Sequence, residues 1–357
     1  MSARTSIKEY YGAIDGLRAF AAIGVVMMHV LKNGNYEISG FIVEQLIGKM
    51  GEFVYLFMII SAFAICCGYY EKILYNEISI GDFYSKRYKK IWPYFALLCL
   101  MDVAVSPSRE VFYELFANLT LCFGLLPNAN ISVIGVGWFL GVVFVFYLLF
   151  PFWVYILSNK KRMWFSVIIA LIYNVLCVNY FMNAEHVVQN YDKRTNFVYC
   201  AIYFLVGGVI FLYKNKLGEW SGKYRWICLS LCVFSAFLYF SITSNLVTRI
   251  LLYGILLIYA IGKRDERGIL LNSCTKFISN ISMEIYLCHM LFYRVVEKLH
   301  LTHAFGNEVL SYVVTVGVIL GLSIVFSYTI KKIYMLINSH TSKKDFGMCK
   351  GNSTHVE

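Results

Sequence analysis

Charged residues and prolines are both scarce in this sequence, and each shortage excludes a kind of structure. Only 15% of the 357 residues are Asp, Glu, Lys or Arg, whereas 59% are apolar. An ordinary soluble domain is about 25% charged, so the chain has too little polar surface to cover a soluble core of its size. With only 4 prolines, a fold made mainly of loops is excluded and long uninterrupted helices are favoured.

Two further absences concern binding partners. The 11 cysteines are scattered through apolar segments without the spacing of a zinc site, so no metal is expected. The formal charge of +11 comes without a nucleic-acid-binding motif, so we expect no nucleic-acid partner.

A small-residue cleavage pattern does not follow the first apolar run, and we expect that run to be kept as a membrane helix.

Long apolar runs dominate what is present. A helix of about 20 apolar residues crosses a hydrocarbon core about 30 Å thick, and the runs are continuous rather than alternating, which favours helices over a β-barrel. The predicted fold is therefore all-α, a polytopic membrane protein with about ten transmembrane helices. The predicted spans are residues 14–32, 50–70, 91–107, 136–157, 163–181, 197–213, 225–242, 245–262, 275–296 and 309–334.

The stretch 111–127 is apolar but interrupted by Asn118, Gly124 and Pro127, and we expect an interfacial or re-entrant segment. With the N-terminus placed in the cytoplasm, 23 of the 32 Lys and Arg residues fall on inside segments and 8 on outside ones, which predicts that both termini are cytoplasmic. The predicted organisation is a cytoplasmic N-terminus (1–13), one membrane domain (14–335) and a polar, disordered cytoplasmic tail (336–357).

Arg18 and His29 stand out in the first span because ionisable side chains are costly in a bilayer and mostly face a cavity or a partner. They are 11 residues apart, which places them within about 20° of one face and about 16 Å apart along the axis. Asp15 lies three residues before Arg18 and can pair with it. We expect Arg18 and His29 to look into one water-accessible cleft; the alternative is a snorkelling Arg18 and a buried, hydrogen-bonded His29.

Two other groups of ionisable residues adjoin predicted spans. The basic run at 86–90 is either an ordinary cytoplasmic anchor or an anion site, in which Arg87 and Lys90 bind a phosphorylated donor from one turn apart. Glu284 and His289 lie within the ninth span about 140° apart around the helix. At least one of them is expected to point into the bundle.

Five short segments, taken in order, resemble the acyltransferase 3 family of membrane O-acyltransferases. The family's opening pattern "xDGLRAxAAxxVVxxH" has its counterpart in residues 14–29, with the spacing from Arg18 to His29 intact. The counterparts of "FFxxSGFxI", of "RxxRIxP", of the fourth-span block and of "ISxxxYLxH" are residues 57–65, 87–93, 138–151 and 281–289. The resemblance covers nearly the whole chain.

The sequence departs from the family pattern at three places. Ala62 stands where Gly is usual, and Lys90 stands where the second Arg is usual. Many members carry a pair of Glu residues in the fourth span, where this chain has Val142, Val143, Phe144 and Val145. No catalytic carboxylate is therefore expected at that position.

The resemblance implies transfer of an acyl group, most often acetyl from acetyl-CoA, to a hydroxyl of a surface or cell-envelope polysaccharide. His29 would be the general base for the hydroxyl, while Arg18, held by Asp15, would stabilise the oxyanion or bind the pantetheine or pyrophosphate end of the donor. Arg87 and Lys90 would bind CoA phosphates. The remaining residues expected at the substrate site are Ser61, Trp138, Tyr147 and His289.

The resemblance also implies a bacterial inner-membrane location and no permanently bound cofactor. Two other functions are compatible with many spans and buried ionisable residues. One is a transporter or flippase of a glycan or lipid-linked sugar. The other is a scaffold or sensor whose site has decayed, which the missing acidic pair would fit. The oligomeric state is open.

Overall fold

The computed structural model describes residues 10–105, 107–126, 133–189, 191–263 and 267–351, with side chains described up to residue 337. Helices and connecting loops make up these ranges, and no strand occurs within them. The predicted all-α class is confirmed. The α-helices are α1 (Gly12–Gly34), α2 (Phe53–Leu74), α3 (Ile80–Val105), α4 (Arg109–Leu119), α5 (Trp138–Leu157), α6 (Lys160–Leu176), α7 (Phe197–Leu212), α8 (Lys214–Lys223), α9 (Arg225–Phe237), α10 (Leu246–Lys263), α11 (Ser273–Asn280), α12 (Ser282–Lys298) and α13 (Glu308–Gly351).

Membrane-spanning helices account for most of the described chain. The stretches that are long and apolar enough to cross a bilayer number 7, or 8 if α7 and α8, which meet at a 76° bend, form one broken span. The 7 are Gly12–Gly34, Ile42–Leu74, Gly135–Leu157, Lys160–Phe181, Arg225–Ile242, Leu246–Lys263 and Glu308–Ile337. The chain is therefore a multi-pass membrane protein, and the predicted count of about ten spans is approximate.

The other predicted spans also fall on helices within the described residues, with one difference. The span predicted at 275–296 is two helices, α11 and α12, because Ile281 leaves helical backbone angles (φ −120°, ψ 14°). The stretch 111–127 contains α4, whose 11 residues extend only about 16 Å. This length is too short to cross a bilayer, in line with the predicted non-spanning segment; Pro127 lies outside the described residues.

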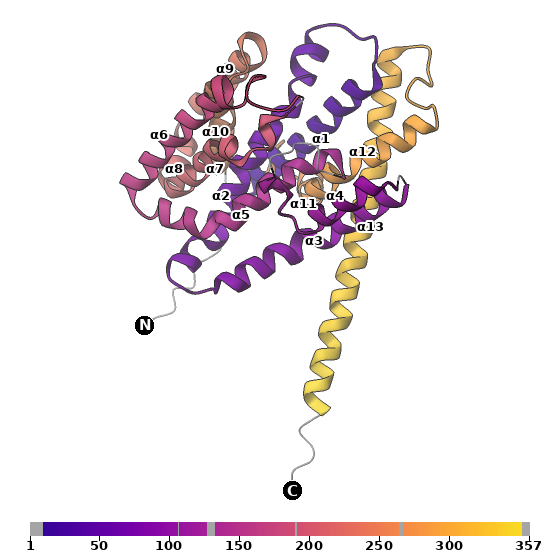
Figure 1. Cartoon of the computed structure of the whole chain (residues 1–357). Coiled ribbons are helices and arrows are strands. Elements are labelled where there is room, and N and C mark those ends of the chain that lie inside the picture. Colours follow the sequence, from indigo (N-terminus) through magenta and orange to yellow (C-terminus); the bar gives the residue numbers. More distant parts are fainter. Residues whose placement is uncertain (1–9, 106, 127–132, 190, 264–266, 352–357) are drawn as a thin grey trace.

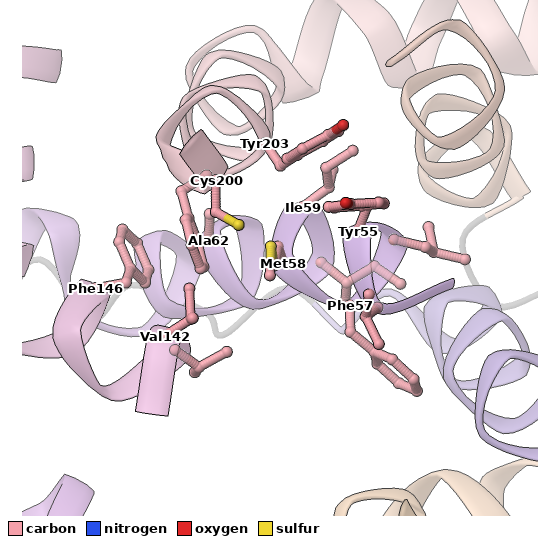
Figure 2. Close-up of a cluster of buried hydrophobic side chains, with 14 of the residues drawn as sticks. Tyr55, Phe57, Met58, Ile59, Ala62, Val142, Phe146, Cys200 and Tyr203 are labelled. Carbon is pink, nitrogen blue, oxygen red and sulfur yellow. The ribbon is translucent and has the colours of Figure 1, made fainter. Parts of the chain in front are cut away.

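The centre of the molecule is α2, which packs between α5 and α7 (Figure 2). The Tyr55 ring of α2 stacks on Tyr203 of α7 with centroids 4.3 Å apart. Gly207 permits this close approach of the two helices, since a Cβ atom there would lie 2.2 Å from the backbone oxygen of Ile59. Aromatic stacking of this kind adds to the packing that holds membrane helices together.

The helix α1 is also central, contacting α2, α10, α11, α12 and α13. In contrast, α6 and α9 lie on one side of the bundle and α13 lies on the opposite side (Figure 1). The apolar stretches containing α6 and α9 are only 17% and 22% buried, against 61% for α1. Apolar side chains exposed in this way are suited to contact with lipid.

The long final helix extends beyond the bundle. α13 runs to Gly351, and its later part projects away from the other helices (Figure 1). The helix therefore continues into the stretch predicted as a disordered tail from residue 336. No proline interrupts residues 336–351, so the backbone can continue hydrogen-bonding as a helix.

Candidate active site

A cavity of about 270 Å³ opens among α1, α2, α3, α5, α11, α12 and α13. Its charged lining consists of four basic residues and two acidic ones. These are Arg18, Arg87, Lys90, Lys331, Asp15 and Glu284. The excess of positive charge suits an anionic ligand.

Asp15 connects Arg18 to the neighbouring helix α11. Its carboxylate lies 3.9 Å from the Arg18 guanidinium and accepts a hydrogen bond of 2.8 Å from the Ser279 hydroxyl, as well as one from Tyr10. The close packing of α1 depends on Gly16, because a Cβ atom there would lie 2.2 Å from the backbone oxygen of Leu270. The Asp-Gly-Leu-Arg sequence thus combines an ion pair with a close helix contact.

Arg87 and Lys90 reach the cavity from α3. Nη2 of Arg87 donates a 2.7 Å hydrogen bond to the hydroxyl of Tyr69. Its Nε is buried and has no hydrogen-bond partner within the described part of the chain. Across the same residues, neither Arg87 nor Lys90 forms a direct ion pair with an acidic side chain. A guanidinium donor that is buried without an acceptor is costly.

Lys331 is a fourth cation that the sequence did not indicate as part of the site. It lies on α13 with its Nζ 3.8 Å from Oε1 of Glu284, and it donates to the backbone oxygen of Asn280. Since Lys331 and Arg18 line one cavity, the middle of α13 and the start of α1 lie close together. The only sequence signal was a basic pair after an apolar run, which normally indicates an anchor.

Three aromatic rings form an apolar part of the cavity lining. Phe139 of α5 contacts Tyr286 of α12 with centroids 5.4 Å apart, and both contact Phe57 of α2 at 6.1 and 6.4 Å. The Tyr286 hydroxyl donates a 2.9 Å hydrogen bond to the backbone oxygen of Val136. Its ring centroid lies 6.0 Å from that of His289, which does not itself line the cavity.

His29 lies beyond this group of rings. It is absent from the cavity lining, which corrects the expectation that Arg18 and His29 look into one cleft. The ring of His29 instead contacts that of His289, with Nδ1 of His29 3.0 Å from Nε2 of His289. Periodicity predicted a shared helix face, but His29 contacts His289 of α12 whereas Arg18 lines the cavity. Both Glu284 and His289 point into the bundle, as predicted for at least one of them.

The other predicted site residues divide in the same way. Ser61 and Tyr147 line the cavity, whereas Trp138 does not. Trp138 instead lies under the guanidinium of Arg194, 5.3 Å from ring to carbon. Burial disfavours the charged form of Arg194, but hydrogen bonds and the charge of Asp192 outweigh this and raise the pKa of Arg194, so the guanidinium stays charged. Sequence reasoning did not single out Asp192 or Arg194.

Within the described ranges, no group of three or more His, Cys, Asp and Glu side chains is arranged to hold a metal ion.

Comparison with known families gives a match to an acyltransferase domain over residues 11–330. Together with the many apolar helices, this match defines the class of the molecule as a membrane acyltransferase. The matched region is nearly the whole chain, and the chain belongs to the acyltransferase 3 family, which confirms the resemblance of its motifs. Neither the curated proteins nor the solved structures contain a match.

Proposed function

We propose that this membrane acyltransferase is an O-acetyltransferase, moving acetyl from cytoplasmic acetyl-CoA to a hydroxyl of a cell-envelope or exported polysaccharide. The observation that carries the proposal is the basic cavity, in which Arg87 and Lys90 form no direct ion pair with an acidic side chain among the described residues. CoA is a polyanion whose phosphates supply several acceptors. Guanidinium and ammonium groups are well suited to bind them.

The structure favours one of the two roles considered for Arg18. Arg18 and His29 are 11 residues apart on one helix, a rise of about 16 Å. An oxyanion donor has to lie about 3 Å from the reacting oxygen, so Arg18 does not serve a reaction at His29 in this way. It binds the phosphate or pantetheine part of the donor instead, and Asp15 holds it in place.

The donor then has to reach from the cavity to His29. The pantetheine arm of CoA is long and unbranched, and its thioester lies at the far end from the phosphates. With the phosphates at Arg87 and Lys90, the arm passes the rings of Phe57, Phe139 and Tyr286, which line the cavity. This placement brings the thioester to the imidazole while the nucleotide end stays in the basic cavity.

The transfer needs one base at the thioester. His29 takes the proton of the acceptor hydroxyl as the hydroxyl oxygen attacks the thioester carbonyl. When the tetrahedral intermediate collapses, the carbon–sulfur bond breaks and the thiolate takes the proton from His29. The products are an acetyl ester and free CoA, and the imidazole returns to its neutral form.

The acceptor approaches from the end of the bundle opposite to the cavity. His29 lies in the later half of α1, away from Arg18. The excess of Lys and Arg in the predicted inside loops supports an orientation in which the cavity and both termini face the cytoplasm, and we place the protein in a bacterial inner membrane. Donor and acceptor thus reach His29 from opposite sides of the membrane.

The test uses inverted membrane vesicles from cells that make the polysaccharide, supplied with radiolabelled acetyl-CoA. We expect the label to enter the polysaccharide, and His29→Ala to lower the rate by about 10²- to 10⁴-fold. Deletion of the protein should abolish labelling and leave polysaccharide export unchanged. Lost export with unchanged labelling would instead show a transporter or flippase. Full acetyl transfer by His29→Ala would remove His29 from the mechanism.

A further inference from the structure

Two imidazoles from distant parts of the chain meet inside the bundle. His29 lies on α1 and His289 on α12, with ring centroids 5.0 Å apart. His289 has 0% of its surface exposed, whereas His29 is partly exposed. The imidazole that can meet a substrate is therefore His29, and His289 lies behind it.

The position of each proton follows from the partners of His289. Its Nδ1 is 2.7 Å from the backbone oxygen of Tyr286. A carbonyl oxygen can only accept a hydrogen bond, so Nδ1 of His289 carries the hydrogen. In a neutral imidazole the other nitrogen is then an acceptor, which makes Nε2 of His289 the acceptor in this pair.

The same reasoning continues to His29. Its Nδ1 is 3.0 Å from Nε2 of His289, a normal hydrogen-bond distance. Because Nε2 of His289 accepts, Nδ1 of His29 donates and carries the hydrogen. The lone pair of neutral His29 is therefore on Nε2, the nitrogen that does not face His289.

We infer that His289 is a positioning residue, which fixes His29 in the tautomer and ring orientation that leave Nε2 free to accept the proton of the acceptor hydroxyl. The inference rests on the proposed function, in which His29 is the base. The hydrogen bond also persists after the proton arrives, since both nitrogens of an imidazolium donate. His289 stays neutral throughout and touches neither substrate, so the expected substrate contact of His289 is replaced by an indirect role.

Two substitutions of His289 distinguish its role as a hydrogen-bond acceptor from a role in packing alone. In His289→Gln the side-chain oxygen can replace Nε2 as the acceptor for His29, while His289→Leu fills the space without an acceptor. We expect His289→Leu to lower kcat for acetyl transfer by about tenfold or more, with little change in KM for acetyl-CoA. His289→Gln should retain most of the activity. A fall as large in His289→Gln as in His289→Leu, with normal binding of CoA by both, would overturn the inference.

A double substitution distinguishes this inference from the proposed function. Residues that act as one unit are not additive, so His289→Leu should cause no further loss in a His29→Ala background. A further loss would show that His289 acts independently of His29. If His29→Ala alone keeps full activity, the proposed base is wrong, a result that differs from failure at His289 only.

Nitrogen NMR of isotope-labelled histidine reports the tautomer without any activity measurement. The wild-type protein in lipid nanodiscs should show His29 protonated on Nδ1 and unprotonated on Nε2, with the signals assigned by their loss in His29→Ala. In His289→Leu the two tautomers should mix. A wild-type His29 ring protonated on Nε2 would overturn the inference whatever the transfer rates are.

Discussion

The guanidinium of Arg87 lies over the ring of Tyr69, with its carbon 4.7 Å from the ring centroid. The same two residues share a hydrogen bond, so the orientation of the guanidinium is fixed by stacking as well as by donation. Arg87 is thereby held at the cavity with Nε still lacking an acceptor. Preorganised in this way, it loses less entropy when an anion binds.

The first prediction concerns the affinity for the donor. Arg87→Ala should raise KM for acetyl-CoA by about 10- to 100-fold, because hydrogen bonds to charged groups contribute about 1.5–3 kcal/mol. The value of kcat should change little, since Arg87 is remote from His29. Lys86→Ala is the matched control, because Lys86 is exposed on the same helix and does not line the cavity. Equal effects of the two substitutions would contradict a phosphate site at Arg87.

The second prediction concerns Lys331, which the sequence did not single out. Lys331→Ala should raise KM for acetyl-CoA by about twofold to fivefold, as expected for a partly exposed charge. The change removes one cation and also leaves Glu284 unpaired in the cavity, where its charge repels phosphate. The neighbouring Lys332 is exposed and outside the cavity, so Lys332→Ala should leave KM unchanged. The measurement is a donor titration of the purified protein in nanodiscs.

The third prediction concerns the close contact of α1 with the segment before α11. A Cβ atom at Gly16 would meet the backbone of Leu270, which cannot move aside as a flexible side chain can. Gly16→Ala should therefore destabilise the protein by about 1–3 kcal/mol, measured as a lower melting temperature in detergent. Gly68 on α2 has open space around it, and Gly68→Ala should be neutral or stabilising by about 0.5–1 kcal/mol. A stable Gly16→Ala protein would show that this contact is not tight.

The fourth prediction concerns the aromatic rings between the cavity and His29. Phe139→Ala should widen the passage, so that kcat/KM for butyryl-CoA rises relative to acetyl-CoA by about tenfold or more, the discrimination that extra methylene groups give in a close-fitting apolar site. Phe152 of the same helix is 68% exposed, and Phe152→Ala should leave the ratio unchanged. An unaltered ratio in Phe139→Ala would mean that the acyl group does not pass this ring.

The sequence indicated many residues of the site but not how Arg18 and His29 are separated within the bundle. Helical periodicity predicted that Arg18 and His29 share one face of α1, and in the structure Arg18 lines the cavity with residues of α12 while His29 contacts His289 of α12. Periodicity describes one helix at a time, however, and could not show that Phe57, Phe139 and Tyr286 meet between them. Such a partition depends on how distant helices pack, which no local pattern of residues determines.

Of the charged residues that line the cavity, the sequence likewise indicated some and not others. Arg87 and Lys90 were recognisable because they occur in a run with a family counterpart. Lys331 follows an apolar helix, where a basic residue ordinarily serves as an anchor, and only the packing of α13 on α12 brings it to Glu284. The break at Ile281 was also hidden, because an apolar residue with non-helical backbone angles looks the same in sequence as one inside a helix.

Tyr286 takes part in two hydrogen bonds, one through its side chain and one through its backbone. Its hydroxyl is tied to Val136 through the side chain, whereas its backbone oxygen holds His289 as part of the helix. Swinging the phenol ring about the Cα–Cβ bond, as passage of a donor arm requires, breaks only the tie to Val136. The carbonyl stays in place during that swing, and the two imidazoles keep their alignment while the thioester arrives.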